Sequence, residues 1–134
     1  MSMHLWQKIA VVALGGALGT MCRAGLSILV QGRLAQRLPG WPSFPWGTVS
    51  VNLAGCFGFG LAWALLEARW QHAEAARLLV LTGFMGAFTT FSTFMFDTAE
   101  LGMSRVGLAI GNVLLQNAAG LLLVFAGLAL GRVF

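Results

Sequence analysis

The chain has 134 residues, of which 58% are hydrophobic and only 9% are charged, and its mean hydropathy is +0.83. A soluble domain carries about 25% charged residues and a disordered chain has few apolar ones, so this composition excludes both classes. It predicts an all-α membrane protein, because a helix needs about 20 apolar residues to cross a hydrocarbon core of about 30 Å and this length admits about four such helices.

Uncharged stretches divide the chain into four expected transmembrane helices within a single domain, residues 1–134. We expect the spans at roughly 5–31, 45–67, 76–101 and 104–131. The first resembles a secretory signal peptide, because Lys8 precedes an apolar run. That run is rich in glycine, continues past Arg23 and lacks a clean cleavage site, so we interpret it as a membrane span. No segment remains for a catalytic domain.

Arg23 is a charged residue inside the first span. At 1.5 Å per residue it lies about 27 Å beyond Leu5, near the opposite interface. The sequence leaves two interpretations open. The side chain snorkels to the interface, or it lies in a vestibule where it attracts anions or pairs with an acid such as Asp97 or Glu100.

Side-chain amides and hydroxyls recur one helical turn apart in the second and fourth spans. Thr48 and Asn52 share a helix face, and so do Asn112 and Gln116. Polar groups inside a membrane must find partners, so these residues either form hydrogen bonds that hold helices together or supply donors along a hydrated path.

The third span has poor helix propensity at its middle. Gly83 and Gly86 precede the β-branched Thr89 and Thr90, whose hydroxyls can bond backbone carbonyls. We therefore expect the helix to break here, and carbonyls freed by such a break can bind a cation.

Phe91 and Phe94 follow the expected break. They are three residues apart, so both rings lie on one face of a helix and can line the same cavity. Plain packing is the alternative for aromatic rings in a membrane helix.

The charged residues are spread singly, so the formal net charge of +4 does not indicate a nucleic-acid partner. With four spans, one side of the membrane receives four basic residues and the other receives three. The first set is Lys8, Arg69, Arg77 and Arg132, and the second is Arg33, Arg37 and Arg105. This weak bias leaves orientation undetermined, or it reflects insertion in both orientations and assembly as an antiparallel pair.

No enzyme chemistry is indicated by the remaining reactive residues. Cys22 and Cys56 fall in different spans without metal-binding spacing, and His4 and His72 lie outside the spans. We expect no catalytic residues.

At the polar positions above, the sequence resembles the CrcB family, also called Fluc, the small fluoride channels of microbial inner membranes. The matching residues are Gly15, Gly19 and Arg23, then Gly47, Thr48, Asn52 and Gly55, then Gly83 to Phe94, and finally Asn112 and Gln116. The third-span motif, which ends in Thr-Thr-Phe-Ser-Thr-Phe, is the most specific of them.

The resemblance implies a multi-pass protein of the bacterial inner membrane that lets toxic cytoplasmic fluoride leave by passive flux. It further implies an antiparallel, dual-topology homodimer with two fluoride pathways. A structural sodium ion on the two-fold axis is implied to bind the backbone carbonyls of Gly86 and Thr89. Implied pathway residues are Asn52, Phe91, Phe94, Ser92, Thr48, Asn112, Gln116 and Arg23.

This chain departs from the family pattern at Ala87, Asp97 and Gly120, where glycine, glutamate and serine are usual.

Two functions of other classes remain as alternatives. A small multidrug exporter also has four spans, but it needs an acid in the first span, and this chain has none there. A structural subunit of a membrane complex would use Asn52 and Gln116 only to hold helices together.

Overall fold

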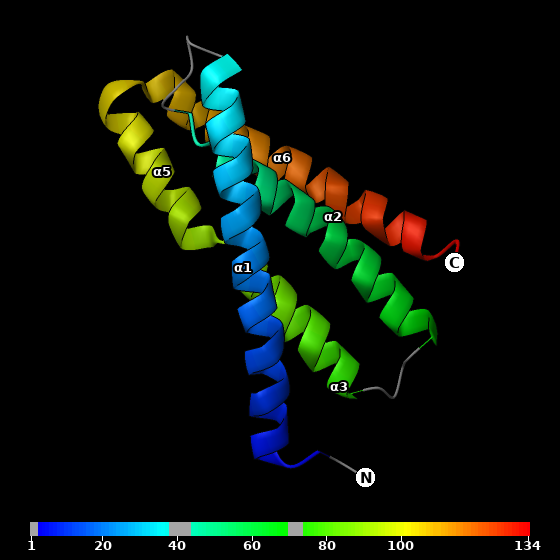
Figure 1. Ribbon diagram of the computed structural model, residues 1–134. Helices are drawn as coiled ribbons and strands as arrows, with labels where there is room; N and C mark the ends of the chain where they lie inside the picture. Colours follow the sequence, from blue (N-terminus) through cyan, green and yellow to red (C-terminus); the bar gives the residue numbers. More distant parts are fainter. Residues whose placement is uncertain (1–2, 38–43, 70–73) are drawn as a thin grey trace.

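The computed structural model describes residues 3–37, 44–69 and 74–134, and its elements are all helical (Figure 1). In chain order they are α1 (Leu5–Arg37), α2 (Trp46–Arg69), α3 (Glu74–Arg77), the π-helix η1 (Leu78–Met85), α4 (Gly86–Phe88), α5 (Phe91–Ser104) and α6 (Val106–Gly131). The expected all-α class is confirmed.

Within the described residues, four helical segments are long and apolar enough to cross a membrane, as the sequence predicts. They are Leu5–Leu34, Trp46–Arg69, Glu74–Ser104 and Val106–Gly131, the third of which combines α3, η1, α4 and α5. Helix α1 has 33 residues, about 50 Å, and extends beyond the expected end at residue 31. Its end at Arg37 precedes Pro39, and helices usually end at or before the residue that precedes a proline.

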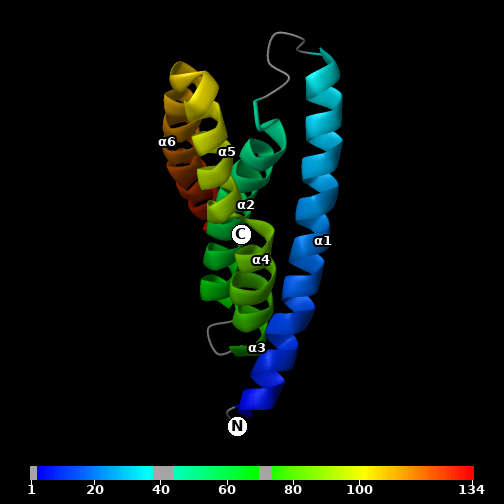
Figure 2. The same ribbon diagram turned by 90° about the vertical axis from the view of Figure 1, so that its left-hand side faces the viewer.

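The two halves of the third span pack against different helices. Its first half, η1 and α4, packs against α1, whereas its second half, α5, packs against α6. Helix α2 runs alongside α6 and also contacts α1 and the third span (Figures 1 and 2). The third span therefore crosses from the α1 side to the α6 side where it passes α2.

Helices α2 and α6 approach each other at glycines. A Cβ atom added to Gly60 would overlap the carbonyl oxygen of Val124, and one added to Gly127 would overlap the carbonyl oxygen of Phe57. Small residues allow such close backbone packing in membranes, where apolar burial provides little drive for helix association. The pair α2 and α6 thus forms a tight frame for the polar residues that both carry.

The π-helix η1 was not predicted, since the sequence analysis expected an α-helix up to the break. Its backbone packs directly on α1, because a Cβ atom on Gly15 would overlap the Leu79 carbonyl oxygen and one on Gly19 the Phe84 carbonyl oxygen. Hydrophobic spacing does not distinguish a short π-helix from an α-helix, and π-helices are rare.

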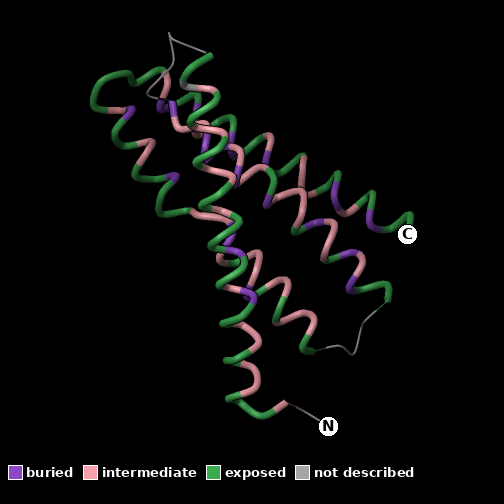
Figure 3. The backbone as a smooth tube through the Cα atoms, viewed as in Figure 1, coloured by how far each residue is buried: buried purple, intermediate pink, exposed green. Residues whose placement is uncertain are grey.

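Buried and exposed positions alternate along the helices (Figure 3), and the buried side chains include polar as well as apolar ones. Asn112 is fully buried, and Thr48 and Gln116 are each 8% exposed. Large apolar side chains cover the outside of α1, α5 and α6, among them Met21, Met103 and Leu122. This is the arrangement expected when lipid rather than water surrounds the protein.

Candidate functional site

The third span breaks at Thr89 and Thr90, as the sequence predicts. Thr89 has ψ of 158°, and Thr90 has φ of −146° and ψ of 111°, so both leave the helical conformation. In a continuous helix the Thr90 N–H would donate to the Gly86 carbonyl. Here it donates instead to Asn52 Oδ1 at 2.9 Å.

Asn52 on α2 stabilises this break with both ends of its amide. Its Oδ1 accepts from the Thr90 N–H, and its Nδ2 donates to the Thr90 carbonyl oxygen at 3.2 Å. Backbone groups freed inside a membrane need partners from neighbouring elements. Thr90 also caps α5, since its hydroxyl oxygen accepts from the Thr93 N–H at 3.3 Å. The break is therefore specified by α2 as well as by its own sequence.

The amides of α2 and α6 form one continuous cluster. Asn52 Nδ2 donates to Gln116 Oε1 at 2.7 Å, and Gln116 Nε2 donates to Asn112 Oδ1 at 2.9 Å. Asn112 Nδ2 in turn donates to the Thr98 hydroxyl on α5 at 2.8 Å. The sequence predicts that these three amides have partners. Two of their five hydrogen bonds join one amide to another, and the other three involve the Thr90 backbone and the Thr98 hydroxyl.

A cavity of about 320 Å³, which we call the amide cavity, lies between α2, the break and α6. Its lining includes five of the predicted site residues, namely Asn52, Thr89, Phe91, Phe94 and Gln116. The remaining lining residues are Gly55, Cys56, Phe59, Thr90, Asn117 and Val124. Amides, hydroxyls and ring edges thus share one open space at membrane depth.

The two phenylalanines differ in burial although both line this cavity. Phe94 is 5% exposed and Phe91 is 73% exposed. Their ring centroids are 6.0 Å apart with an interplanar angle of 57°, a tilted arrangement that presents ring edges as well as faces. Phe94 belongs to the packed interior, whereas Phe91 is largely exposed.

Arg23 and Thr48 line a second cavity, of about 290 Å³, which Thr90 also borders. The Thr48 hydroxyl donates to Asp97 Oδ2 at 2.6 Å. Among the residues that the structure describes, Arg23 forms no ion pair with Asp97 or Glu100. Its position beside Thr48 and Thr90 places a cation next to the amide cavity without direct contact with an acid.

Three other predicted residues lie outside the lining of the amide cavity. Ser92 is exposed on the first turn of α5, and Asn112 reaches the cavity only through Gln116. Gly86 is exposed on the α1 side of the break. The Thr89 hydroxyl, in contrast, bonds its own helix by donating to the Met85 carbonyl oxygen at 3.1 Å.

Sequence reasoning missed Thr98, Cys56 and Asn117. Thr98 donates to the carbonyl oxygen of Phe94, four residues earlier, at 2.7 Å, which is a common bond for a threonine inside a helix. That spacing was visible in the sequence. Its acceptance of a bond from Asn112 was not, because it depends on how α5 packs on α6.

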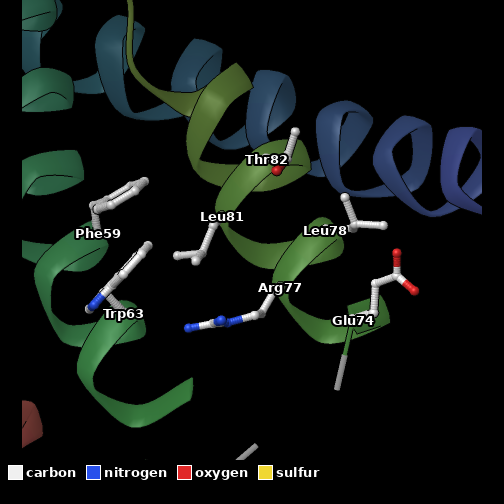
Figure 4. A pocket seen from close by; sticks show the side chains of 7 residues that line it. All are labelled: Phe59, Trp63, Glu74, Arg77, Leu78, Leu81 and Thr82. Carbon is white, nitrogen blue, oxygen red and sulfur yellow. The ribbon is translucent and has the colours of Figure 1, made fainter. Parts of the chain in front are cut away.

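A larger cavity, of about 580 Å³, lies between α2 and the start of the third span (Figure 4). Its lining is Phe59, Trp63, Glu74, Arg77, Leu78, Leu81 and Thr82. The Arg77 guanidinium lies 5.3 Å from the centroid of the Trp63 ring, a cation–π contact. None of the predicted site residues lines this space.

The chemistry of the site is that of weak donors and carbonyl oxygens. Across residues 3–37, 44–69 and 74–134 there is no group of three or more His, Cys, Asp and Glu side chains that could hold a metal ion. Amide N–H groups, hydroxyls and aromatic edges interact favourably with an anion, and backbone carbonyls interact favourably with a hard cation.

Known proteins match this chain over nearly its whole length. Residues 10–128 match the family described as "CrcB-like protein, Camphor Resistance (CrcB)". The chain is 48% identical to the fluoride-specific ion channel FluC of Nitrosococcus oceani over 130 residues, which cover 96% of this chain and 99% of that protein. It is 46% identical to the fluoride-specific ion channel FluC of Solidesulfovibrio magneticus over 127 residues, 94% of this chain and 97% of that one. With four spans, a third helix broken beside an amide cavity, and these relatives, the chain belongs to the CrcB-like family of membrane proteins.

Proposed function

We propose that this protein is a fluoride-specific ion channel that lets fluoride leave the cell passively down its electrochemical gradient. The observation that carries the proposal is the 48% and 46% sequence identity to two fluoride-specific ion channels over 96% and 94% of this chain. These relatives are channels rather than enzymes, and the chain is not an enzyme. We assign it to the bacterial inner membrane.

In the proposed pathway, fluoride exchanges its hydration shell for weak protein donors. Gln116 Nε2 gives one hydrogen to Asn112, and within the described residues its second hydrogen has no protein acceptor. The edges of Phe91 and Phe94 supply further positive potential in the same cavity. Because these donors carry no full charge, the anion binds well enough to enter and weakly enough to leave.

The other predicted residues take supporting roles in the proposed pathway. Arg23 attracts anions toward the cavity that it shares with Thr48 and Thr90, while Ser92 offers a hydroxyl at the exposed start of α5. Both hydrogens of Asn52 Nδ2 already have acceptors, Gln116 Oε1 and the Thr90 carbonyl oxygen. Asn52 therefore meets the ion only when one of these bonds lengthens.

We further propose that two copies assemble as an antiparallel, dual-topology homodimer with two pathways. The near-equal numbers of basic residues on the two sides support insertion in both orientations. Phe91, 73% exposed in one subunit, gains a neighbour from the second copy in this assembly.

A sodium ion on the two-fold axis of this dimer is also proposed, with the Gly86 and Thr89 carbonyls of both copies as ligands. The backbone fits such a role. The usual donor to the Gly86 carbonyl is diverted to Asn52, and the extended ψ of Thr89 turns its carbonyl out of the helix. Four carbonyl oxygens without an acid suit a hard monovalent cation.

The function is tested by fluoride efflux from proteoliposomes, recorded with a fluoride electrode. The purified protein should release trapped fluoride and retain chloride. Asn52→Asp should reduce efflux by at least about 100-fold, because a carboxylate only accepts hydrogen bonds and repels the anion. The matched control is Gln7→Glu at the start of α1, where the side-chain oxygen accepts from the His4 N–H and remains an acceptor. Failure of the unmodified protein to release fluoride would refute the function.

A further inference from the structure

We infer that Thr98 is a positioning residue of the fluoride pathway, which fixes the orientation of the amides on α2 and α6 without touching the ion. The inference rests on the proposed function only for its effect on transport. Its structural basis is a set of hydrogen bonds that all point in one direction.

These bonds form one continuous circuit, which begins at the backbone N–H of Thr90 and ends at the backbone carbonyl oxygen of Phe94. The Thr90 N–H donates to Asn52, Asn52 to Gln116, Gln116 to Asn112, Asn112 to Thr98, and the Thr98 hydroxyl to the Phe94 carbonyl oxygen. The five distances lie between 2.7 and 2.9 Å. In such a chain each bond polarises the next, so the bonds strengthen one another.

The ends of the circuit determine its direction. A backbone N–H can only donate and a carbonyl oxygen can only accept, so Thr90 requires an oxygen from Asn52 and Phe94 requires a hydrogen from Thr98. Every amide between them then has one permitted orientation. The circuit consequently directs Gln116 Nε2 toward Asn112, and the second hydrogen of that nitrogen is the one available to an ion.

Within the circuit, the position of Thr98 requires a hydroxyl group, because its oxygen must both accept and donate a hydrogen bond. It accepts from Asn112 and donates to Phe94 through the same oxygen. Asn112 is fully buried, so water does not substitute for a lost partner. Removing the hydroxyl leaves Asn112 Nδ2 without an acceptor, and the amide must turn or withdraw, which releases Gln116 and then Asn52.

The test compares Thr98→Val, which keeps the shape of the side chain, with Thr98→Ser, which keeps the hydroxyl. Thr20→Val, at an exposed position of α1, is the matched control for loss of a threonine hydroxyl. Fluoride efflux is measured in proteoliposomes, and hydrogen exchange of the Thr90 amide is measured by NMR in detergent micelles. Near-ultraviolet circular dichroism confirms that each variant keeps its tertiary structure.

We expect Thr98→Val to lower efflux at least tenfold and to accelerate exchange of the Thr90 amide by a similar factor, while Thr98→Ser and Thr20→Val stay within about threefold of the unmodified protein for both. Efflux and exchange unchanged in Thr98→Val would overturn the inference, as would equal losses in the valine and serine variants.

If Thr98→Val does not fold, Thr98→Ser and Asn112→Asp test the inference in its place. Asn112→Asp keeps the acceptor for Gln116 but cannot donate to Thr98, so unaltered Thr90 exchange in that variant would also overturn it. The exchange measurement gives its answer even if the unmodified protein does not conduct fluoride, which separates this inference from the function itself.

Discussion

Phe91 and Phe94 show how two identical side chains on one helix face acquire different energetic roles. Both line the amide cavity, but Phe94 is 5% exposed and Phe91 is 73% exposed. Truncating or reshaping Phe94 disturbs packing inside the subunit. In the proposed pathway, Phe91 instead acts at the surface of the cavity, where the quadrupole of its ring edge can act on an anion.

Replacing Phe91 with isoleucine should therefore reduce fluoride efflux much more than it reduces stability. An aliphatic side chain of similar size has no positive edge, so we expect at least about a tenfold loss of efflux with stability within about 1 kcal/mol. Phe94→Ile is the companion variant, in which part of any loss of efflux reflects the buried position and the thermal unfolding temperature falls as well. A Phe91→Ile channel that conducts at the normal rate would return this ring to a packing role.

Among the helices, the contact between α2 and α6 depends on missing side chains. At Gly60 and Gly127 an added Cβ atom would meet the backbone of the facing helix, and backbone cannot move aside as a side-chain end can. This contact holds Asn52 and Gln116 at hydrogen-bond distance.

Gly60→Ala should destabilise the protein, and Gly25→Ala should not. The added methyl at Gly60 forces α2 and α6 apart at an expected cost of about 1–3 kcal/mol. At Gly25 on α1 a Cβ atom would have no neighbour within 4 Å, so the better helix propensity of alanine should leave stability equal or higher by up to about 1 kcal/mol. Unfolding in a denaturing detergent, followed by circular dichroism, measures both. Equal stability of the two variants would contradict backbone contact between α2 and α6.

A further prediction concerns the sodium site that is proposed at the break in the third span. Replacing sodium with a large organic cation should lower the stability of the dimer, and Thr89→Val should keep that dependence because its carbonyl is retained. Gly86→Val should abolish it. Within one subunit a Cβ atom on Gly86 would meet only the Leu81 carbonyl oxygen, at 3.9 Å, so the subunit itself tolerates a side chain there. A dimer whose stability ignores sodium would exclude the site.

Two contacts of basic side chains join the ends of different helices. Lys8 at the start of α1 forms an ion pair with Glu74 at the start of the third span, and Arg69 at the end of α2 donates to the Phe134 carbonyl oxygen. The first contact joins the start of α1 to the start of the third span, and the second joins the end of α2 to the C-terminal residue beyond α6.

The proposed dual topology agrees with the near balance of basic residues counted from the sequence, and it should be visible in cells. Reporter fusions at Phe134 should give signals from both sides of the membrane. Two or three lysines added after Met1 should force one orientation and abolish efflux when that variant is expressed alone, because parallel copies cannot form the crossed dimer. Detection of the unmodified protein in a single orientation would refute dual topology.

The sequence by itself determined the solvent of this protein, its helical class, its four spans and the position of the break. These features depend on composition and on local preference, since uncharged runs of sufficient length must be helical in a membrane and Thr89 and Thr90 weaken a helix at its middle. It also singled out Asn52, Asn112 and Gln116, because amides in apolar segments are conspicuous.

Only the tertiary structure decided how those amides bond, which of them line the cavity and that Thr98 completes their circuit. Hydrogen bonds between α2, α5 and α6 depend on how close the helices lie, and glycines distant in sequence such as Gly60 and Gly127 set that distance. Spacing within one helix carries no information about a partner 38 or 64 residues away. The exposure of Phe91 and the π-helix η1 likewise depend on contacts between elements, which the sequence pattern of one element does not record.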